Sequence, residues 1–228
     1  MLGRSGSKPS VAVVLAGCGN RDGSEIHETV LTFLAIHRHG ADYQCYALNR
    51  DQAAVVSHLS GEKMTETRNG LVEAARLARG RILPLDAFDA QTHDALIFPG
   101  GFGAIGNLCD YAEKGTDCRP LPEVARAIAA MRTAGKPIGA LCIAPVLLAS
   151  AVQGLTLTIG NNDKVAADLK AMGARHEEAG PDGVVVDKSS RVVTTPCYMF
   201  DSIRLDTLAD SIDHLVAAVL ALAQENAA

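Results

Sequence analysis

Residues 136–145 (KPIGALCIAP) place a single thiol, Cys142, at the end of a short apolar run. Such a run is typical of a buried parallel strand, and Pro145 is tolerated in the first turn of a helix. The pattern predicts a strand-to-helix turn that holds Cys142 above the carboxyl ends of the strands. Because unpaired N–H groups and the helix dipole favour an anion there, we expect Cys142 to be a nucleophile with a lowered pKa.

Two glutamates, Glu25 and Glu28, are candidates for moving protons at this thiol. They stand three residues apart, so they share one face of the helix expected before Gly40. Counting from the preceding strand favours Glu25 as the acid/base, whereas counting back from Gly40 favours Glu28. Since helix spacing is rigid and loop length varies, we choose Glu28 and keep Glu25 as the alternative. His27 would face elsewhere and is interpreted as a packing or surface residue.

A glycine-rich loop at residues 99–106 directly follows an expected strand at residues 94–98. Gly100 and Gly101 would let backbone N–H groups approach a substrate oxygen, and the N–H groups of Gly101 and Ile143 are the expected oxyanion donors. Residues 101–106 (GFGAIG) also match a dinucleotide-binding fingerprint. We interpret the match as fortuitous, because no strand ending in an acidic residue follows at the required spacing.

The elements that must position these groups alternate between strands and helices, which predicts an α/β fold with a mainly parallel sheet. Expected strands are residues 10–16, 42–48, 94–98, 137–141 and 155–159, with a β-hairpin at 184–187 and 191–194. Expected helices include residues 65–79, 122–134, 145–150, 163–172 and 202–224, besides the one that follows Ser24 as N-cap. Periodicity assigns the buried face of the first helix to Ile26, Val30, Phe33, Leu34 and His37, and that of the last helix to Leu205, Leu208, Ile212, Leu215, Val219 and Leu222.

The 228 residues carry a net charge of -5 with scattered basic residues, which favours a small-molecule partner over nucleic acid or membrane. Six cysteines form no Cys-x-x-Cys pair, and no histidine stands at metal-ligand spacing, so no metal site is expected. We expect a flexible tail at residues 1–10 followed by a single domain at residues 11–228. With no secretion signal or membrane span recognised, we expect a cytoplasmic protein.

Several motifs together resemble one known family. They are residues 17–19 (GCG), 22–28 (DGSEIHE), 64–69 (MTETRN), 98–103 (FPGGFG), 135–139 (GKPIG), 142–145 (CIAP) and 194–196 (TTP). In these stretches the chain is similar to the ElbB glyoxalase branch of the ThiJ/PfpI, class I glutamine amidotransferase-like superfamily. The resemblance extends from about residue 11 to residue 222.

The resemblance implies a flavodoxin-like three-layer sandwich and a homodimer, with an elbow cysteine paired to a glutamate of the first helix. It further implies a cofactor-free glyoxalase that converts glyoxal to glycolate through a cysteine hemithioacetal, with deglycase activity using the same parts. One departure stands out: Ile143 follows the cysteine, and residues 158–162 (TIGNN) occupy a region where relatives place a histidine. Glutamine hydrolysis is therefore not expected, and a catalytically weak regulatory or redox-sensing protein is the alternative.

Overall fold

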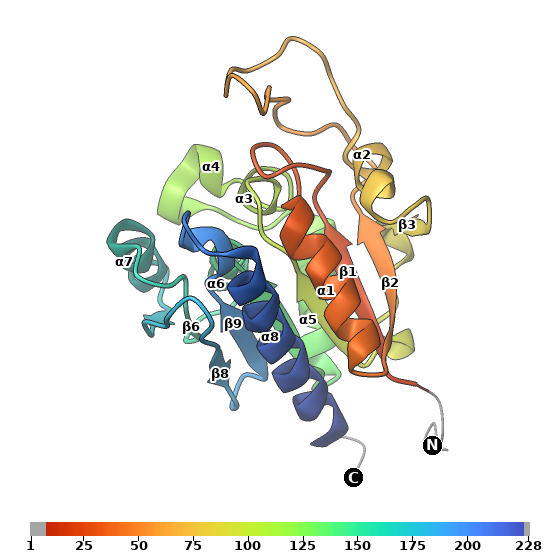
Figure 1. The fold of residues 1–228 in the computed structure, drawn as a ribbon, viewed down its shortest axis with the longest axis vertical. Coiled ribbons are helices and arrows are strands. Elements are labelled where there is room, and N and C mark those ends of the chain that lie inside the picture. The colour runs from red at the N-terminus through yellow and green to blue at the C-terminus, as the bar shows by residue number, and fades with distance from the viewer. Residues whose placement is uncertain (1–7, 226–228) are drawn as a thin grey trace.

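Residues 8–225, which the computed structural model describes, are organised around a seven-stranded sheet in the order β3-β2-β1-β4-β5-β9-β8 (Figure 1). All neighbouring strands run parallel except the β8–β9 pair, which is antiparallel. The predicted α/β class, the mainly parallel sheet and the hairpin are confirmed. The strands are β1 (Ser10–Leu15), β2 (Asp42–Ala47), β3 (Ile82–Pro84), β4 (Ala95–Phe98), β5 (Ile138–Leu141), β8 (Val185–Asp187) and β9 (Val192–Thr195).

Three features of the strands differ from expectation. The three-residue strand β3 was missed, because so short a segment carries no periodicity. The strand expected at residues 155–159 shrinks to β6 (Thr156–Leu157), which pairs with the unpredicted β7 (Arg175–His176) in a separate two-stranded sheet. Of the tail expected at residues 1–10, residues 1–7 lie outside the described part of the chain, whereas Ser10 already belongs to β1.

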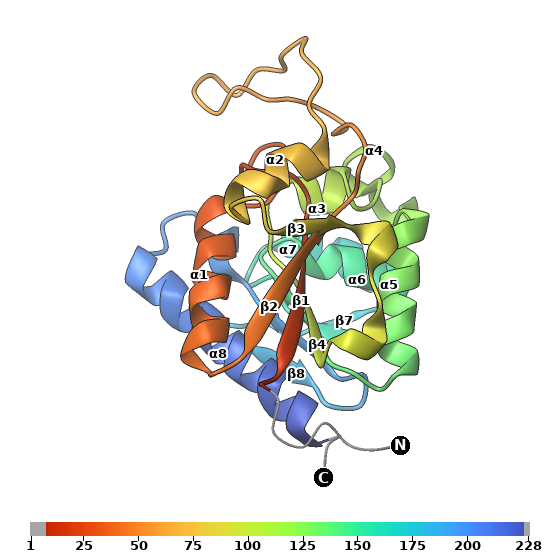
Figure 2. The ribbon, with the colours of Figure 1, turned by 90° about the vertical axis from the view of Figure 1, so that its right-hand side faces the viewer.

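Helices cover both faces of the sheet, as the flavodoxin-like sandwich requires. Figure 2 shows α1 and α8 on one side, and α5 and α6 on the other. The helices are α1 (Ile26–Arg38), α2 (Gly70–Leu77), α3 (Gly103–Gly106), α4 (Tyr111–Lys114), α5 (Pro122–Thr133), α6 (Pro145–Ala151), α7 (Asp163–Ala171) and α8 (Leu205–Glu225). Single 3₁₀ turns occur at Leu85–Ala87, Ala90–Thr92, Gly115–Asp117 and Cys197–Met199.

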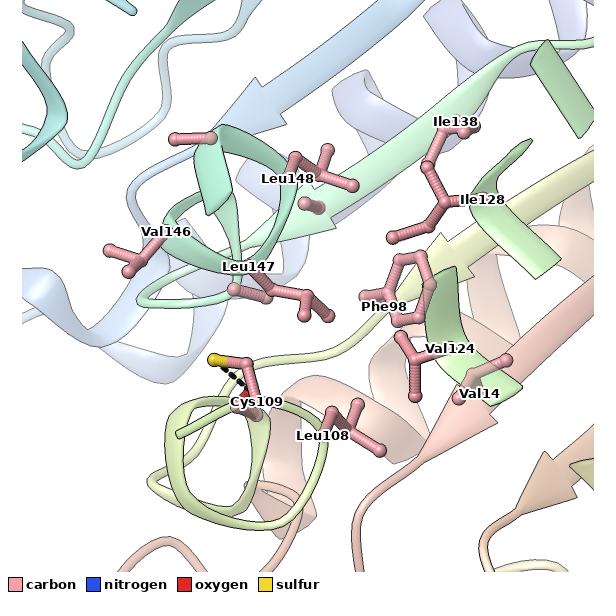
Figure 3. Packing of buried hydrophobic residues seen from close by; sticks show 14 of the residues in the cluster. Val14, Phe98, Leu108, Cys109, Val124, Ile128, Ile138, Val146, Leu147 and Leu148 are labelled. Atoms are coloured by element: carbon pink, nitrogen blue, oxygen red, sulfur yellow. Dashed lines mark hydrogen bonds between the residues drawn. The ribbon is translucent and has the colours of Figure 1, made fainter. Parts of the chain in front are cut away.

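The two buried cores follow from the alternation of side chains along the central strands. In β1, Val11, Val13 and Leu15 pack with α1 and α8, whereas Ala12 and Val14 pack on the opposite side with α5 and α6. Both faces of a strand are apolar when helices cover both faces of a parallel sheet. Figure 3 shows the second of these cores, in which Phe98 of β4 lies against Val124 and Ile128 of α5 and near Leu147 of α6.

The buried face of α1 is not the one that periodicity indicated. Ile26, Val30 and Leu34 are 43%, 49% and 42% exposed, and His37 is exposed as well. The helix instead buries Phe33, Ala35 and Ile36 together with three polar residues: Glu28, Thr29 and Thr32. Both threonine hydroxyls donate to backbone carbonyls one turn earlier, at 2.6 and 2.7 Å, so they are buried without losing hydrogen bonds. The periodicity of apolar residues cannot identify the buried face of α1, because three of the buried residues on it are polar.

The first residues of α1 and α2 also differ from the expected ones, because side-chain caps determine where these helices begin. Glu25 caps α1 by accepting the Glu28 N–H at 2.7 Å, whereas Ser24, the expected N-cap, accepts the Ala16 N–H through its hydroxyl. Asn69 caps α2 by accepting from two N–H groups of its first turn. The helix expected at residues 65–79 therefore begins only at residue 70, and residues 65–69 belong to the long segment that rises beyond the sheet between β2 and α2 (Figure 2).

The last helix offers a matched test of which side chains hold the fold. Leu215 is fully buried against the sheet, whereas Leu205, expected on the same face, is 54% exposed. Leu215→Ala should lower the free energy of unfolding by about 2–5 kcal/mol through the cavity that it leaves. Leu205→Ala should change it by less than about 0.5 kcal/mol. Urea denaturation of both variants measures this difference, and equal losses would contradict the packing described.

Candidate active site

Cys142 occupies the predicted turn between a strand and a helix. Strand β5 ends one residue before it, and α6 begins at Pro145. The Cys142 backbone is left-handed, with φ of 58°, which is costly for a residue other than glycine and persists only where the surroundings enforce it. The Cys142 N–H donates to the Thr195 carbonyl at 2.9 Å, and the Ala144 N–H donates to Leu141 at 2.9 Å. This turn places the thiol beside Glu28, in the first turn of α1.

Glu28 approaches the same thiol from α1 and is fully buried. Its carboxylate accepts the Gly100 N–H at 2.9 Å on Oε2 and the Tyr198 N–H at 3.3 Å on Oε1. It also forms a hydrogen bond with the thiol of Cys142. Backbone from two separate loops therefore fixes the carboxyl group, so that it faces the sulfur.

The glycines of the loop after β4 are required by close packing around this pair. A Cβ on Gly100 would lie 2.5 Å from both the Cys142 Cβ and the Glu28 Oε2. Gly101, with φ of 95°, has no room for a side chain because the Gly23 carbonyl would lie 2.4 Å away. Its N–H donates to the Cys142 sulfur. Gly101 and Gly103 thus pack against the first loop, which gives these two glycines of the dinucleotide-like pattern a structural explanation.

Burial controls the ionisation of both groups. Burial, followed by the charge of Glu25, raises the pKa of Glu28 to about 8, although hydrogen bonds from Tyr198, Cys142 and Gly100 oppose the rise. Burial, followed by the charge of Glu28, raises the pKa of Cys142 well above that of a free thiol. The lowered pKa expected for Cys142 is therefore wrong, because desolvation and a neighbouring carboxylate outweigh the start of a short helix. Near neutral pH both groups keep their protons, and above about pH 8 the pair shares one.

A cavity of about 640 Å³ opens onto Cys142. Its walls include four residues singled out by sequence: Cys142, Ile143, Gly101 and Glu25. Gly100 and Glu28 stand behind this surface and support the thiol. The other wall residues are Asn20, His27, Phe102, Ile105, Tyr111, Asn162, Lys164, Val165, Tyr198, Met199 and Asp201.

Several of these wall residues were missed by sequence reasoning. His27 was assigned elsewhere on α1, yet it lines the cavity, and its Nδ1 atom is hydrogen-bonded to the Tyr198 hydroxyl at 2.7 Å. Tyr198 follows the TTP motif at residues 194–196, and Asn162 ends the TIGNN stretch at 158–162. Both motifs had been noted, but nothing in their spacing indicated that they meet above the cysteine.

Side chains behind the cavity hold the first loop in place. Asn107 donates from Nδ2 to the carbonyls of Ala16 and Asp22 at 2.8 Å each, and Gln52 donates to Asp22 at 3.0 Å. The Asp22 carboxylate accepts the Val56 N–H at 2.8 Å. These bonds tie the loop that carries Asn20 and Glu25 to the segment after β2, so both segments shape the site together.

Of the other thiols, Cys197 lies close to the Cys142–Glu28 pair and Cys18 lies outside the cavity wall. Cys197 is buried, and burial followed by the charge of Glu28 raises its pKa well above the usual value. A charge on Cys197 would raise the pKa of Cys142, so Cys197 lies near the Cys142–Glu28 pair. Cys18 is not part of the cavity wall and instead lies close to Glu73 and Arg76 of α2. All six cysteines are free.

Residues 8–225 contain neither a candidate metal site nor a candidate membrane-spanning helix. Within that range no three His, Cys, Asp or Glu side chains gather closely enough to hold a metal ion. Its helices also include none with the length and apolar character needed to cross a bilayer.

Solved structures define the class to which this fold and site belong. An isoprenoid biosynthesis protein with an amidotransferase-like domain from Ehrlichia chaffeensis superposes with a TM-score of 0.87 at 32% identity, over 93% of this chain and 99% of that one. Glyoxalase III from Candida albicans shares the fold at a TM-score of 0.57 and 13% identity, over 92% and 97% of the two chains. The fold is the class I glutamine amidotransferase-like, flavodoxin-like fold of ThiJ/PfpI proteins. No protein-family model matches the chain.

Sequence relatives identify the family within this class to which the chain belongs. The rat ES1 protein homolog, mitochondrial, is 41% identical over 93% of this chain and 83% of its own length. The human glutamine amidotransferase-like class 1 domain-containing protein 3, mitochondrial, is 41% identical over 93% and 82%. The chain belongs to this ES1 family of glutamine amidotransferase-like class 1 domain proteins. The expectation of a cytoplasmic protein is wrong, because these relatives are named as mitochondrial and nothing in the residues considered reports on that location.

Gly100 provides a test of the packing around the pair. Gly100→Ala should force Cys142 and Glu28 apart, because its Cβ would lie 2.5 Å from atoms of both. We expect a loss of about 1–3 kcal/mol in unfolding free energy, as for other overpacked sites, and a changed rate of Cys142 alkylation.

Gly106→Ala is the matched control, since its Cβ would meet only the Ala112 Cβ at 3.9 Å. Calorimetry and mass spectrometry after iodoacetamide treatment measure both effects. Wild-type stability and alkylation in Gly100→Ala would show that the pair is not packed as described.

Proposed function

We propose that this protein is a cofactor-independent glyoxalase that converts glyoxal to glycolate. The observation that carries the proposal is the buried Cys142–Glu28 pair beneath an open cavity, with the Gly101 N–H directed at the sulfur. A thiol next to a carboxyl group whose pKa is about 8 combines a nucleophile with an acid/base that can both accept and return a proton around pH 8. The likeness to glyoxalase III supports the fold alone.

The first step forms a carbon–sulfur bond. The Glu28 carboxylate takes the proton of the Cys142 thiol as the sulfur attacks one aldehyde carbon of glyoxal. The N–H groups of Gly101 and Ile143 stabilise the oxyanion that develops, and Glu28 returns the proton to give a neutral hemithioacetal. Only the singly protonated pair can start this step, because a protonated Glu28 has no capacity to accept the thiol proton.

The second step is an internal rearrangement. Glu28 removes the hydrogen from the sulfur-bound carbon as a proton, and the electrons move onto the neighbouring carbonyl to give an enediolate. Glu28 returns this proton to the second carbon, and the hydroxyl proton of the first carbon passes to the oxygen of the second. This converts the hemithioacetal into a thioester of glycolate. Water then cleaves the carbon–sulfur bond and restores the thiol. The sum is glyoxal plus water giving glycolate, so no oxidant or reductant is required.

The proposal extends to two further properties. Deglycase activity on early adducts of amines would use the same nucleophile and acid/base. A homodimer is supported by the exposed apolar residues Ile26, Val30 and Leu34 of α1. The alternative, a catalytically weak regulatory or redox-sensing protein, is favoured by one observation: burial raises the pKa of Cys142, which limits the thiolate at neutral pH.

Variants of the two glutamates test the proton transfers. Glu28→Gln should lower kcat for glyoxal by about 10²- to 10⁴-fold, because the amide cannot accept the thiol proton. In the wild type, kcat/KM should rise with pH through about 8 as the pair loses its first proton. Glu25→Gln should retain most activity and move this rise to lower pH, because the Glu25 charge helps to raise the pKa of Glu28.

Glycolate formation and ammonia release, each measured against Cys142→Ala, are the readouts. Glyoxal should give glycolate, and glutamine should give no ammonia. Near-full activity in Glu28→Gln would contradict the mechanism, as would ammonia release from glutamine above the Cys142→Ala background. Absence of glycolate from the wild type would favour the regulatory alternative.

A further inference from the structure

The cavity is much larger than the substrate used to describe the chemistry. Glyoxal is the smallest dicarbonyl, whereas the space above Cys142 measures about 640 Å³. Cavities of roughly 300–1,000 Å³ bury ligands of drug size. A small molecule bound to Cys142 would leave most of this volume to water, and the walls distant from the sulfur would contribute nothing to its recognition.

Polar side chains also line the cavity. Asn20 comes from the first loop, Asn162 and Lys164 from the start of α7, and Asp201 from the segment after β9. The Asn162 Oδ1 accepts the Val165 N–H at 3.1 Å, which caps the helix and leaves the amide N–H groups of the side chain for another partner. Amide and carboxylate groups that converge on one cavity suit a ligand with several hydroxyls, since each hydroxyl both donates and accepts.

Apolar surface lies beside these groups. Phe102 is 60% exposed at the cavity wall, and Tyr111 lines the same space, with its hydroxyl held by Asp168 at 2.5 Å. Aromatic rings next to hydrogen-bonding side chains match a sugar-like chain, which presents C–H groups on one side and hydroxyls on the other. A purely apolar ligand would leave the amides and carboxylates without partners.

The charges of the wall favour a neutral ligand. The lining residues include two carboxylates, Glu25 and Asp201, and one ammonium group, Lys164. Neither Asp201 nor Lys164 forms an ion pair within residues 8–225. A phosphorylated or carboxylated ligand would meet an excess of negative charge. An uncharged polyol could instead donate hydrogen bonds to the carboxylates and accept them from the ammonium group.

We propose that the preferred substrate is an uncharged, polyhydroxylated α-oxoaldehyde derived from a sugar, with glyoxal as a minimal analogue. This inference rests on the proposed glyoxalase chemistry. The aldehyde carbon forms the bond to the Cys142 sulfur, the proton moves from that carbon to the neighbouring one, and water releases a 2-hydroxy acid. The atoms balance as for glyoxal, and the hydroxylated chain extends toward Asn20, Asn162 and Phe102.

The experiment compares kcat/KM for 3-deoxyglucosone and glyoxal with the full-length protein. We expect the wild type to prefer 3-deoxyglucosone by about 10-fold or more, because only the longer substrate contacts the polar and aromatic side chains of the wall. Asn20→Ala and Phe102→Ala should each reduce this preference several-fold. Leu59→Ala, at a residue that is 99% exposed and outside the cavity wall, should leave the preference unchanged.

The outcomes separate this inference from the proposed function. Turnover of glyoxal with equal or slower turnover of 3-deoxyglucosone would overturn the inference and leave the glyoxalase proposal standing. No acid from either compound would overturn both. Inorganic phosphate serves as the charge probe: competitive inhibition of glyoxal turnover that Lys164→Met abolishes would indicate an anionic substrate and contradict the uncharged class proposed.

Discussion

The structure depends most on a carboxyl group and a thiol buried side by side. Glu28 and Cys142 come from α1 and from the turn after β5, and they meet only because Gly100 between them has no side chain. Two ionised groups cannot share a desolvated site, so burial fixes the number of protons that the pair holds. The left-handed backbone of Cys142, the hydrogen bonds of Glu28 to two loops and the polar face of α1 all serve to hold this pair in place.

The contribution of the Cys142–Glu28 pair to the free energy of unfolding varies with pH. The pKa of Glu28 rises from 4.5 to about 8 on folding, so the acid form is favoured in the folded protein. Its contribution to stability is fully present below about pH 4.5 and is lost as pH rises through about 8. The loss begins near pH 4.5 and is complete near pH 8, where the singly protonated pair forms. Glu28 therefore contributes least to the free energy of unfolding in the pH range in which the proposed chemistry requires the singly protonated pair. Such a trade-off is common where a site stores destabilising interactions.

The sequence was enough to predict the sheet and the pairing of Cys142 with Glu28, but not the cavity. The apolar runs around β1, β4 and β5, together with Pro145 after Cys142, were enough to predict parallel strands and the strand-to-helix turn. Helix spacing from Gly40 selected Glu28, the glutamate that the structure pairs with the thiol. The raised pKa of Cys142 could not be predicted, because desolvation depends on packing from distant segments. Asn162 and Tyr198 were missed for the same reason: residues distant in sequence meet at the site only through the sheet order.

A titration of the Glu28 carboxyl group tests the central claim most directly. With glutamate labelled at the side-chain carboxyl carbon, the ¹³C signal that is absent from Glu28→Gln can be followed as a function of pH. The account predicts that this signal titrates near pH 8, and that it stays well above 4.5 in Cys142→Ala because burial is the main cause. A Glu28 signal that titrates near 4.5 in the wild type would contradict the buried, proton-sharing pair on which the proposed chemistry depends.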